Sequence, residues 1–501
     1  MVKTASVILG VLCLSGSLFA ADTIVEKNMP KRSIKSSMKE VYHVLPQEAD
    51  NLSDMFSQGV FYGRLRFNSF AFKWGNEEVF KNGKPARKDH AIAAVGGSII
   101  YKSAYFNGFA FTLGVYGTEG KGSLDDNEAY LYKAGKGSFS RFDVLNGGRS
   151  GIVSIAQAYL EYKNRFMDIK AGRQIFESFL TASNDTKMIP NTFEGVTLST
   201  KVIPDTQVKI AYLTREKLRD HSEFHHVLAR GNATPATIKN VYSENDDTAV
   251  HFGLTVNALA EAGVDDRLFI IDAANKSVDN LALRMNYTAV PDIVSSGMIQ
   301  ADYTMNIDGF TVIPALRYMQ QFDNGGGEIM GDKAANLKTV TKGYTDPGSL
   351  DSWMAAARVD VKKDAWKLRF GYSQIADEAD LIAPWRGFPT AGFSRAMAQY
   401  NWYANTRTYM IRGDFDFGKA GLVPKMKAFM RYAIQDFDDA KQGVQADDQV
   451  ITLDILKEIG SIPNLYLKFR MAHVWGDPQT GDIKKLDPSY DEARFEVNYL
   501  F

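Results

Sequence analysis

The sequence predicts an all-β protein, a transmembrane antiparallel β-barrel of about eighteen strands. The last nine residues, 493–501, alternate between an apolar face and a polar face and end on the aromatic residue Phe501. Because side chains alternate with a period of two in a strand, this segment suits a wall with lipid on one side and water on the other. Although 45% of the residues are hydrophobic, no apolar run after the first twenty residues is long enough for a spanning helix.

The first twenty residues resemble a secretory signal. Lys3 supplies a positive charge, residues 7–14 form a short apolar core, and the small residues Ala20 and Ala21 suit cleavage. We therefore expect residues 1–20 to be a signal peptide. Since Cys13, the single cysteine, leaves with it, the mature chain is expected to form no disulfide and to hold no cysteine metal site.

Residues 21–56 read as a polar N-terminal extension on the periplasmic side. Charged residues are frequent in it and fit a possible helix: Lys31, Arg32, Lys35, Lys39 and Glu40. The segment is too short to form a plug domain of the kind that fills large transport barrels. The barrel itself is expected to span residues 57–501.

Alternation begins in the first strand of this barrel. Phe61, Leu65 and Phe67 lie on one face, and Arg64 and Arg66 on the other. The other candidate strands are 91–104, 108–117, 153–162, 166–174, 193–201, 207–215, 248–257, 281–289, 297–306, 310–320, 351–361, 366–375, 400–417, 424–434, 450–458, 464–474 and 491–501.

Short and long connections alternate between these strands, as periplasmic turns and external loops do in bacterial barrels. The alternation fails in one region, where 258–280 is long at the place of a turn and 290–292 is short at the place of a loop. The strand assignment across 258–296 is therefore left open.

Basic residues fall on the face opposite the apolar one on most strands. An arginine that faces lipid at mid-bilayer costs roughly 2–4 kcal/mol, whereas one that faces a wet lumen costs little. We expect a basic inner wall of Arg64, Arg66, Arg284, Arg317, Arg358, Lys367, Arg369, Arg412, Arg431, Lys468, Arg470 and Arg494. Two interpretations of each residue remain open. It guides a passing anion, which a single wall charge at a distance of ~8 Å attracts by about 0.5 kcal/mol in water, or it holds the wall together through ion pairs.

The third external loop, 175–192, mixes apolar and polar residues and is expected to fold into the lumen and narrow it. The constriction residues proposed from this stretch and the start of the next strand are Asn184, Asp185, Lys187, Pro190, Phe193 and Glu194.

Several segments resemble the OprD-type outer-membrane porin family. The runs 171–174 and 184–195 look like the third-loop signature of that family, 212–220 resembles the segment that follows it, and 418–422 with Arg431 resembles a late hairpin. Residues 384–389 resemble loops in the version found in epsilon-class proteobacteria. The resemblance implies a barrel of eighteen strands, monomeric or loosely trimeric, that passes small and often carboxylate-bearing nutrients along a ladder of lumen arginines.

The expected function is therefore passive diffusion of small hydrophilic solutes across the outer membrane, with a bias toward anions. We expect no catalytic residue, no metal and no cofactor, since the histidine-rich stretch 220–226 matches no zinc spacing and 323–328 lacks the pattern of a calcium loop. Expected partners are outer-membrane lipids, the solutes, and the barrel assembly machinery through Phe501. With 58 basic and 59 acidic residues, net charge offers no case for nucleic-acid binding. The alternatives are an adhesin or lipid-facing hydrolase built on the same barrel, or a soluble secreted β-protein.

Overall fold

The computed structural model of the chain describes residues 31–35, 38–78, 80–81, 84–145, 147–219, 221–229, 254–336, 342–397, 400–479 and 482–501. The predicted signal, 1–20, and the first part of the predicted extension, 21–30, lie outside these residues.

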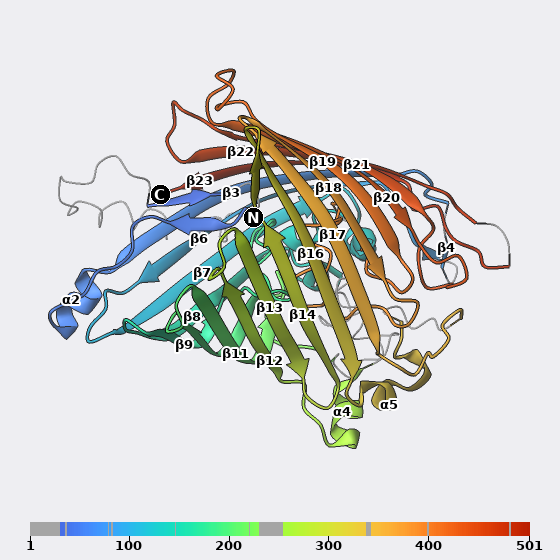
Figure 1. Ribbon diagram of the computed structural model, residues 1–501, viewed down its shortest axis with the longest axis horizontal. Helices are drawn as coiled ribbons and strands as arrows, with labels where there is room; N and C mark the ends of the chain where they lie inside the picture. The colour runs from blue at the N-terminus through green and yellow to red at the C-terminus, as the bar shows by residue number, and fades with distance from the viewer. Residues whose placement is uncertain are drawn as a thin grey trace.

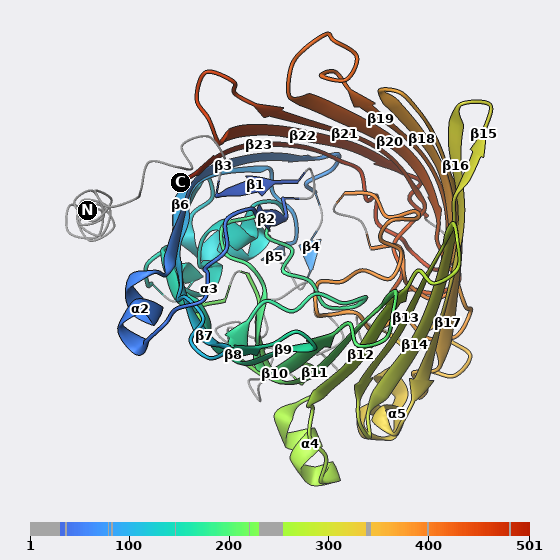
Figure 2. The same ribbon diagram turned by 60° about the vertical axis from the view of Figure 1, so that its left-hand side comes forward.

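The described residues form a closed barrel of eighteen antiparallel strands, which confirms the predicted fold class (Figures 1 and 2). The strands are β3 (Val60–Trp74), β6 (His90–Lys102), β7 (Phe109–Gly122), β8 (Ile152–Lys163), β9 (Met167–Gln174), β10 (Thr192–Thr200), β11 (Thr206–Lys217), β12 (Leu268–Asn275), β13 (Leu281–Val290), β14 (Val294–Tyr303), β16 (Phe310–Asp323), β17 (Ser352–Lys363), β18 (Trp366–Ile375), β19 (Arg407–Asp416), β20 (Met426–Asp436), β21 (Asp448–Glu458), β22 (Leu465–Gly476) and β23 (Tyr490–Leu500). A short segment, β15 (Met305–Ile307), continues β14 alongside β16. Consecutive strands pair with one another, and β23 pairs with β3 to close the ring.

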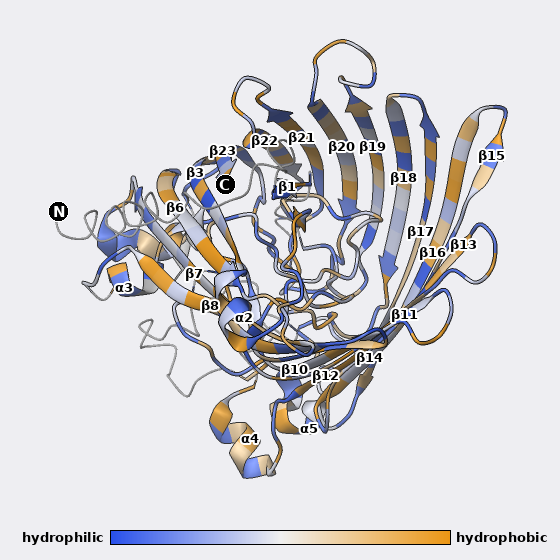
Figure 3. Cartoon of the chain, turned by 90° about the vertical axis from the view of Figure 1, so that its left-hand side faces the viewer, coloured by the Kyte–Doolittle hydropathy of each residue, from blue (hydrophilic) through white to orange (hydrophobic). Residues whose placement is uncertain are grey.

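The two faces of the wall differ as the alternation predicts. On β3 and β6, Leu65 and Val95 are 41% and 57% exposed, whereas Arg64 is only 1% exposed. Figure 3 shows the same alternation as bands of opposite hydropathy along the strands. An apolar outer belt suits contact with hydrocarbon, so the polar inner face is the one that encloses the lumen.

Tight turns join the strands at the end of the barrel where β3 begins and β23 ends. Asparagine or aspartate with positive φ stands in many of them: Asn107, Asp205, Asn280, Asp308, Asp364 and Asn464. These residue types tolerate the left-handed region and close tight turns. Short turns face the periplasm in bacterial barrels, which orients the chain.

One predicted strand is wrong. The stretch 248–257 was expected to be a strand, but 248–253 lies outside the described residues and 256–257 begins the helix α4 (Val256–Ala262). The strand of this region is β12, which pairs with β11 and β13. With β12 in place, 276–280 is the short turn and 291–293 is a genuinely short external connection, so the alternation of turns and loops is restored.

The helix predicted around Lys31 to Glu40 is also wrong. The structure has a hairpin there, β1 (Arg32–Ile34) paired with β2 (Glu40–Tyr42), which lies inside the ring (Figure 2). Ile34 and Met38 pack against Tyr466 and Leu500 on the inner face near the periplasmic end. These apolar contacts with the wall override the local helical pattern.

The remaining elements are short and lie in the extension and the external loops. They are α2 (Leu52–Ser57), β4 (Phe80–Lys81), β5 (Lys84–Pro85), the 3-10 helices η1 (Asp126–Leu131), η2 (Lys136–Ser138) and η5 (Gly331–Lys333), and the helices α3 (Arg141–Leu145) and α5 (Gly326–Met330). Among the described residues, none of the helices has both the length and the apolar character needed to cross a membrane.

The largest buried apolar cluster lies where several external loops meet the inner wall. We define loop 3 as 175–191, loop 4 as 218–267 and loop 7 as 376–406. Leu180 of loop 3, Val227 of loop 4 and Trp385 of loop 7 belong to this cluster. The indole N–H of Trp385 donates to the backbone oxygen of Val227 at 2.7 Å. The apolar core therefore holds loops inside the barrel mouth.

Candidate functional site

The basic residues expected at the inner wall do lie on the inner face of their strands. Three of them form a continuous row, because Arg369 is in register with Arg412 and Arg412 with Arg431. Further round, Arg470 is in register with Arg494. The row exists because each strand presents every second residue to the lumen and the registers align the arginines.

Most of this basic wall is neutralised by neighbouring carboxylates. Arg369 forms a bidentate pair with Asp360 at 2.5 and 2.6 Å, which is the geometry that suits guanidinium best. The other pairs are Arg358 with Asp302, Lys367 and Arg412 with Asp414, Lys468 and Arg470 with Asp454, and Arg494 with Glu492. Of the two interpretations left open by the sequence, the structure shows the second for these residues: they form ion pairs within the wall.

Two arginines differ from the rest of the wall. Within the described part of the chain, no hydrogen bond or ion pair is found for Arg284 or Arg431. Arg431 lies over the ring of Phe429, with 4.9 Å between its guanidinium carbon and the ring centroid. An arginine that is held by an aromatic face keeps its donors available to a passing anion.

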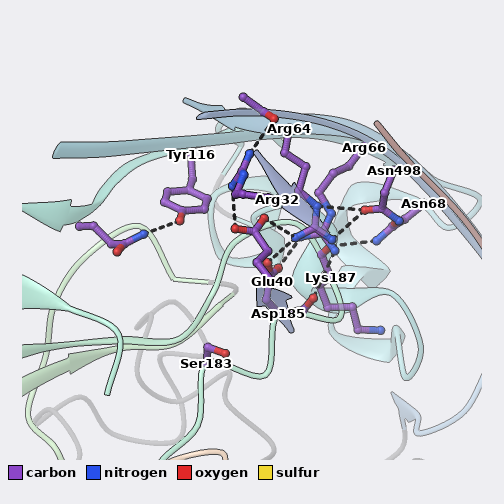
Figure 4. Close-up of polar contacts among 12 residues, drawn as sticks. Arg32, Glu40, Arg64, Arg66, Asn68, Tyr116, Ser183, Asp185, Lys187 and Asn498 are labelled. Atoms are coloured by element: carbon purple, nitrogen blue, oxygen red, sulfur yellow. Dashed lines mark hydrogen bonds and ion pairs between the residues drawn. The ribbon is translucent and has the colours of Figure 1, made fainter. Parts of the chain in front are cut away.

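Loop 3 is attached to the wall through one carboxylate. Asp185 accepts from Arg64 at 2.7 Å through Oδ2 and from Arg66 through Oδ1, and both side chains come from β3 (Figure 4). Arg66 also donates to the backbone oxygen of Asp185 at 3.3 Å, and Asn68 donates to that of Lys187 at 3.0 Å. A row of donors on one strand therefore fixes the tip of loop 3.

The charges at this tip depend on each other. Burial tends to raise the pKa of Asp185, but Arg66 and Arg64 outweigh it and hold the pKa below its ordinary value. Burial, together with the nearby Arg494 and Arg219, lowers the pKa of Lys187 well below its ordinary value. The Lys187 ammonium lies 4.0 Å from the centroid of the Phe70 ring on the wall.

Loop 3 reaches strands far from β3 in the barrel order, and one of them, β16, lies nearly opposite β3. The ring of Phe179 lies 5.1 Å from the guanidinium carbon of Arg317 on β16. On β11, Lys209 donates to the backbone oxygen of Glu177 at 2.5 Å. Contacts with β3 at one end and with β11 and β16 at the other place this loop within the passage.

Loop 7 also folds inward and occupies part of the basic wall. Its backbone oxygens accept from the wall: Pro389 and Ala391 from Arg317 at 2.6 and 2.9 Å, and Gly392 from Arg358 at 3.0 Å and from Arg369 at 2.6 Å. Loop 7 also pairs with loop 3, since Ala182 N–H donates to Trp385 O and Gly387 N–H donates to Leu180 O. These arginines therefore position a loop.

The β1–β2 hairpin is a third inward element. Glu40 pairs with Arg32 at 2.6 Å and with Arg64 at 3.2 Å, so it shares Arg64 with loop 3 (Figure 4). Lys39 pairs with Glu177 of loop 3 at 2.5 Å. Sequence reasoning missed the roles of Glu40, Lys39 and loop 7, and no local pattern marks them, because their partners are distant along the chain.

Two of the predicted constriction residues lie outside loop 3. Phe193 and Glu194 are in β10, not in the loop. Phe193 is fully buried in the large apolar cluster. Glu194 pairs with Arg173 of β9 at 2.7 Å, on the face that also carries the exposed Val196. Expecting Glu194 in the lumen is therefore wrong, because strand parity turns it outward. The other predicted residues, Asn184, Asp185, Lys187 and Pro190, do lie in loop 3.

The histidine-rich stretch of loop 4 serves hydrogen bonding. His226 Nδ1 lies 2.7 Å from Asp266 Oδ1, and this bond raises the pKa of His226. In the residues for which coordinates are described, no three histidine, cysteine or carboxylate side chains are grouped to hold a metal ion.

Comparison with known proteins identifies the family. The sequence profile described as "outer membrane porin, OprD family" matches residues 153–501. Similar solved structures include Pseudomonas aeruginosa OpdK with vanillate, at 12% identity and a TM-score of 0.66, over 89% of this chain and 99% of that one. Another is Acinetobacter baumannii OccAB3, at 15% identity and a TM-score of 0.66, over 89% of this chain and 100% of that one. Pseudomonas aeruginosa OccK8 (OprE) is also similar, at 14% identity and a TM-score of 0.65, over 89% of this chain and 99% of that one. No curated protein sequence matches. The chain belongs to the OprD family of outer-membrane porins, and its location is the bacterial outer membrane.

Proposed function

We propose that this porin is a passive channel for small hydrophilic solutes, biased toward anions such as carboxylates, and that it carries out no catalysis. The observation that carries the proposal is the presence of Arg284 and Arg431 on the inner wall without a carboxylate partner among the described residues. Paired arginines contribute little net field, whereas these two leave positive potential in the passage.

The size of that potential suits passage. A unit positive charge on the wall attracts an anion about 8 Å away by on the order of 0.5 kcal/mol in water. Several such contributions along a path favour entry of an anion without holding it there, which conduction requires. The vanillate named with OpdK is itself a carboxylate, and it supports this choice of solute class.

We further propose that loop 3, with Asn184, Asp185, Lys187 and Pro190, forms the constriction, together with loop 7 and the β1–β2 hairpin. All three contact the inner wall, and loop 3 touches the other two. Their joint position means that the aperture is set by docked segments, and that removal of a docking contact enlarges it.

Three expectations from the sequence enter this proposal unchanged. Residues 1–20 act as a cleaved signal, the chain works as a monomer or loose trimer, and Phe501 presents the chain to the assembly machinery. Phe501 N–H donates to Gly63 O at 3.0 Å on the first barrel strand, so the terminal residue stands at the seam where the barrel closes.

Reversal potentials in planar bilayers test the proposed function. Under a KCl gradient, the purified protein should conduct in steady steps with a reversal potential shifted toward that of chloride. Liposomes loaded with the protein should swell faster in small monocarboxylates than in neutral sugars of the same size. A protein that inserts but never conducts would instead favour an adhesin or a hydrolase.

A further inference from the structure

The segment between the luminal hairpin and the first barrel strand leaves the lumen and passes to the outside of the wall. Inside, the Tyr62 hydroxyl donates to the backbone oxygen of Val44 at 2.7 Å. The chain then pairs with the β6–β7 turn, where Ala49 N–H donates to Tyr105 O at 2.7 Å and Tyr105 N–H donates to Gln47 O at 2.8 Å. Beyond this crossing, helix α2 lies outside the ring beside β6 and β7 (Figures 1 and 2).

Helix α2 is built to hold one orientation. Asn51 caps its N-terminus, with Oδ1 accepting from Asp54 N–H at 2.9 Å. Met55 is buried, and its backbone oxygen accepts from Ala104 N–H at 3.0 Å. The Tyr101 hydroxyl donates to the backbone oxygen of Phe56. These contacts fix which face of the helix points away from the barrel.

That outward face is apolar. Leu52 and Phe56, one helical turn apart, are 59% and 56% exposed. They do not stand alone, because the ring of Phe56 packs on Phe111 of β7 with centroids 5.4 Å apart. Phe111 continues to Tyr101 at 5.6 Å, and Tyr101 to Phe61 at 4.7 Å. Phe56 therefore extends the apolar belt of the barrel at the periplasmic end.

We propose that α2 is an interfacial anchor, which inserts Leu52 and Phe56 into the boundary between headgroups and acyl chains of the periplasmic leaflet. The occupant of this face is lipid because the face is continuous with the belt that lipid already covers in an outer-membrane barrel. Short apolar faces of this kind bury about 5–10 Å into that boundary. The anchor lies outside the wall and the β1–β2 hairpin inside it, so the chain between them clamps the barrel rim.

Spin labels test this proposal in the whole protein. In a Cys13→Ser background the chain has no other cysteine, so Leu52→Cys and Ser57→Cys each give one labelling site on α2. Both positions are exposed, but Ser57 lies on another face of the helix. The labelled proteins are reconstituted in phosphatidylethanolamine–phosphatidylglycerol vesicles, and collision with oxygen is compared with collision with a water-soluble nickel chelate. Leu113→Cys on the exposed face of β7 gives the reference for lipid.

The expected result is that the Leu52 label resembles the Leu113 label, with a high ratio of oxygen to nickel collisions, and that the Ser57 label is reached by nickel. Equal nickel access at positions 52 and 57 would overturn the proposal, because α2 would then stand in water. Low access to both reagents at Leu52 together with spin–spin broadening would also overturn it, by assigning the face to a second copy of the chain.

Discussion

Replacement of Asp185 by alanine isolates the contact that docks loop 3. The side chains of Arg64 and Arg66 are each 1% exposed and that of Asp185 is 13% exposed, so this is a buried ionic cluster. Removal of one partner from such a cluster leaves the other charge buried and unpaired, which costs about 3–5 kcal/mol. After the substitution, Arg64 still contacts Glu40 at 3.2 Å and Asn498 at 2.8 Å. We therefore expect a cost in the lower part of that range.

This cost falls on the docked state, since undocked loop 3 would leave Arg64 and Arg66 in the water of the lumen. A loss of about 3 kcal/mol changes the docking equilibrium roughly 100-fold, at 1.4 kcal/mol for each factor of ten. We therefore expect Asp185→Ala to show larger and noisier single-channel steps in planar bilayers than the unmodified protein. Asp185→Asn, which keeps the shape and loses the charge, should fall between them.

The pH dependence follows from the same carboxylate. Because the folded pKa of Asp185 is lowered by Arg66 and Arg64 against the effect of burial, its contribution is complete above the ordinary carboxyl pKa, about 4, and is lost as the pH falls through the lowered value. Channel noise of the unmodified protein should therefore rise in acid below about pH 4, while Asp185→Ala is noisy throughout.

A matched control is Asp265→Ala, which breaks the exposed pair with Arg267 in loop 4. Exposed pairs are worth about 0–1 kcal/mol, so its conductance should be unchanged. The reasoning is refuted if Asp185→Ala gives folded, heat-modifiable barrels whose conductance and noise match those of the control at every pH.

Three further predictions concern the wall and the loops. Arg284→Gln with Arg431→Gln should move the reversal potential toward cations without a change in barrel stability, because neither residue loses an ion partner within the described part of the chain. A double variant as anion-selective as the unmodified protein would assign these arginines no electrostatic role. Phe370→Arg, at a 49% exposed position on the outer face, should reduce folding into vesicles by roughly 2–4 kcal/mol. Arg431→Gln, on the inner face and without a carboxylate partner among the described residues, should still assemble, and equal yields of the two would mean that the assigned faces are wrong. Trp385→Ala should cost about 3–5 kcal/mol of local stability where loops 4 and 7 meet. The measurement is protease cleavage, which should become faster in those loops while the barrel stays intact, and unchanged cleavage rates would argue against this packing.

Some of the site was predictable because it depends on local patterns. The side-chain period of two assigns Arg64 and Arg66 to the face opposite Leu65, and the same rule places Arg494 opposite Phe495. Loop 3 stood out through its mixture of apolar and polar residues. Where the local pattern is weak, the predicted strand 248–257 was wrong and the assignment across 258–296 was left open. There, β12 is identified only by its pairing with β11 and β13.

The sequence by itself determined that this chain is a membrane barrel with a basic inner face, because burial against lipid imposes its period on every strand and the charge cost forbids the reverse. Only the tertiary structure decided which arginines are engaged. Arg64 meets Glu40 and Asp185, 24 and 121 residues away, and Arg317 meets Pro389, 72 residues away. These pairs depend on how three segments fold into one enclosed space, and no local periodicity encodes that distance.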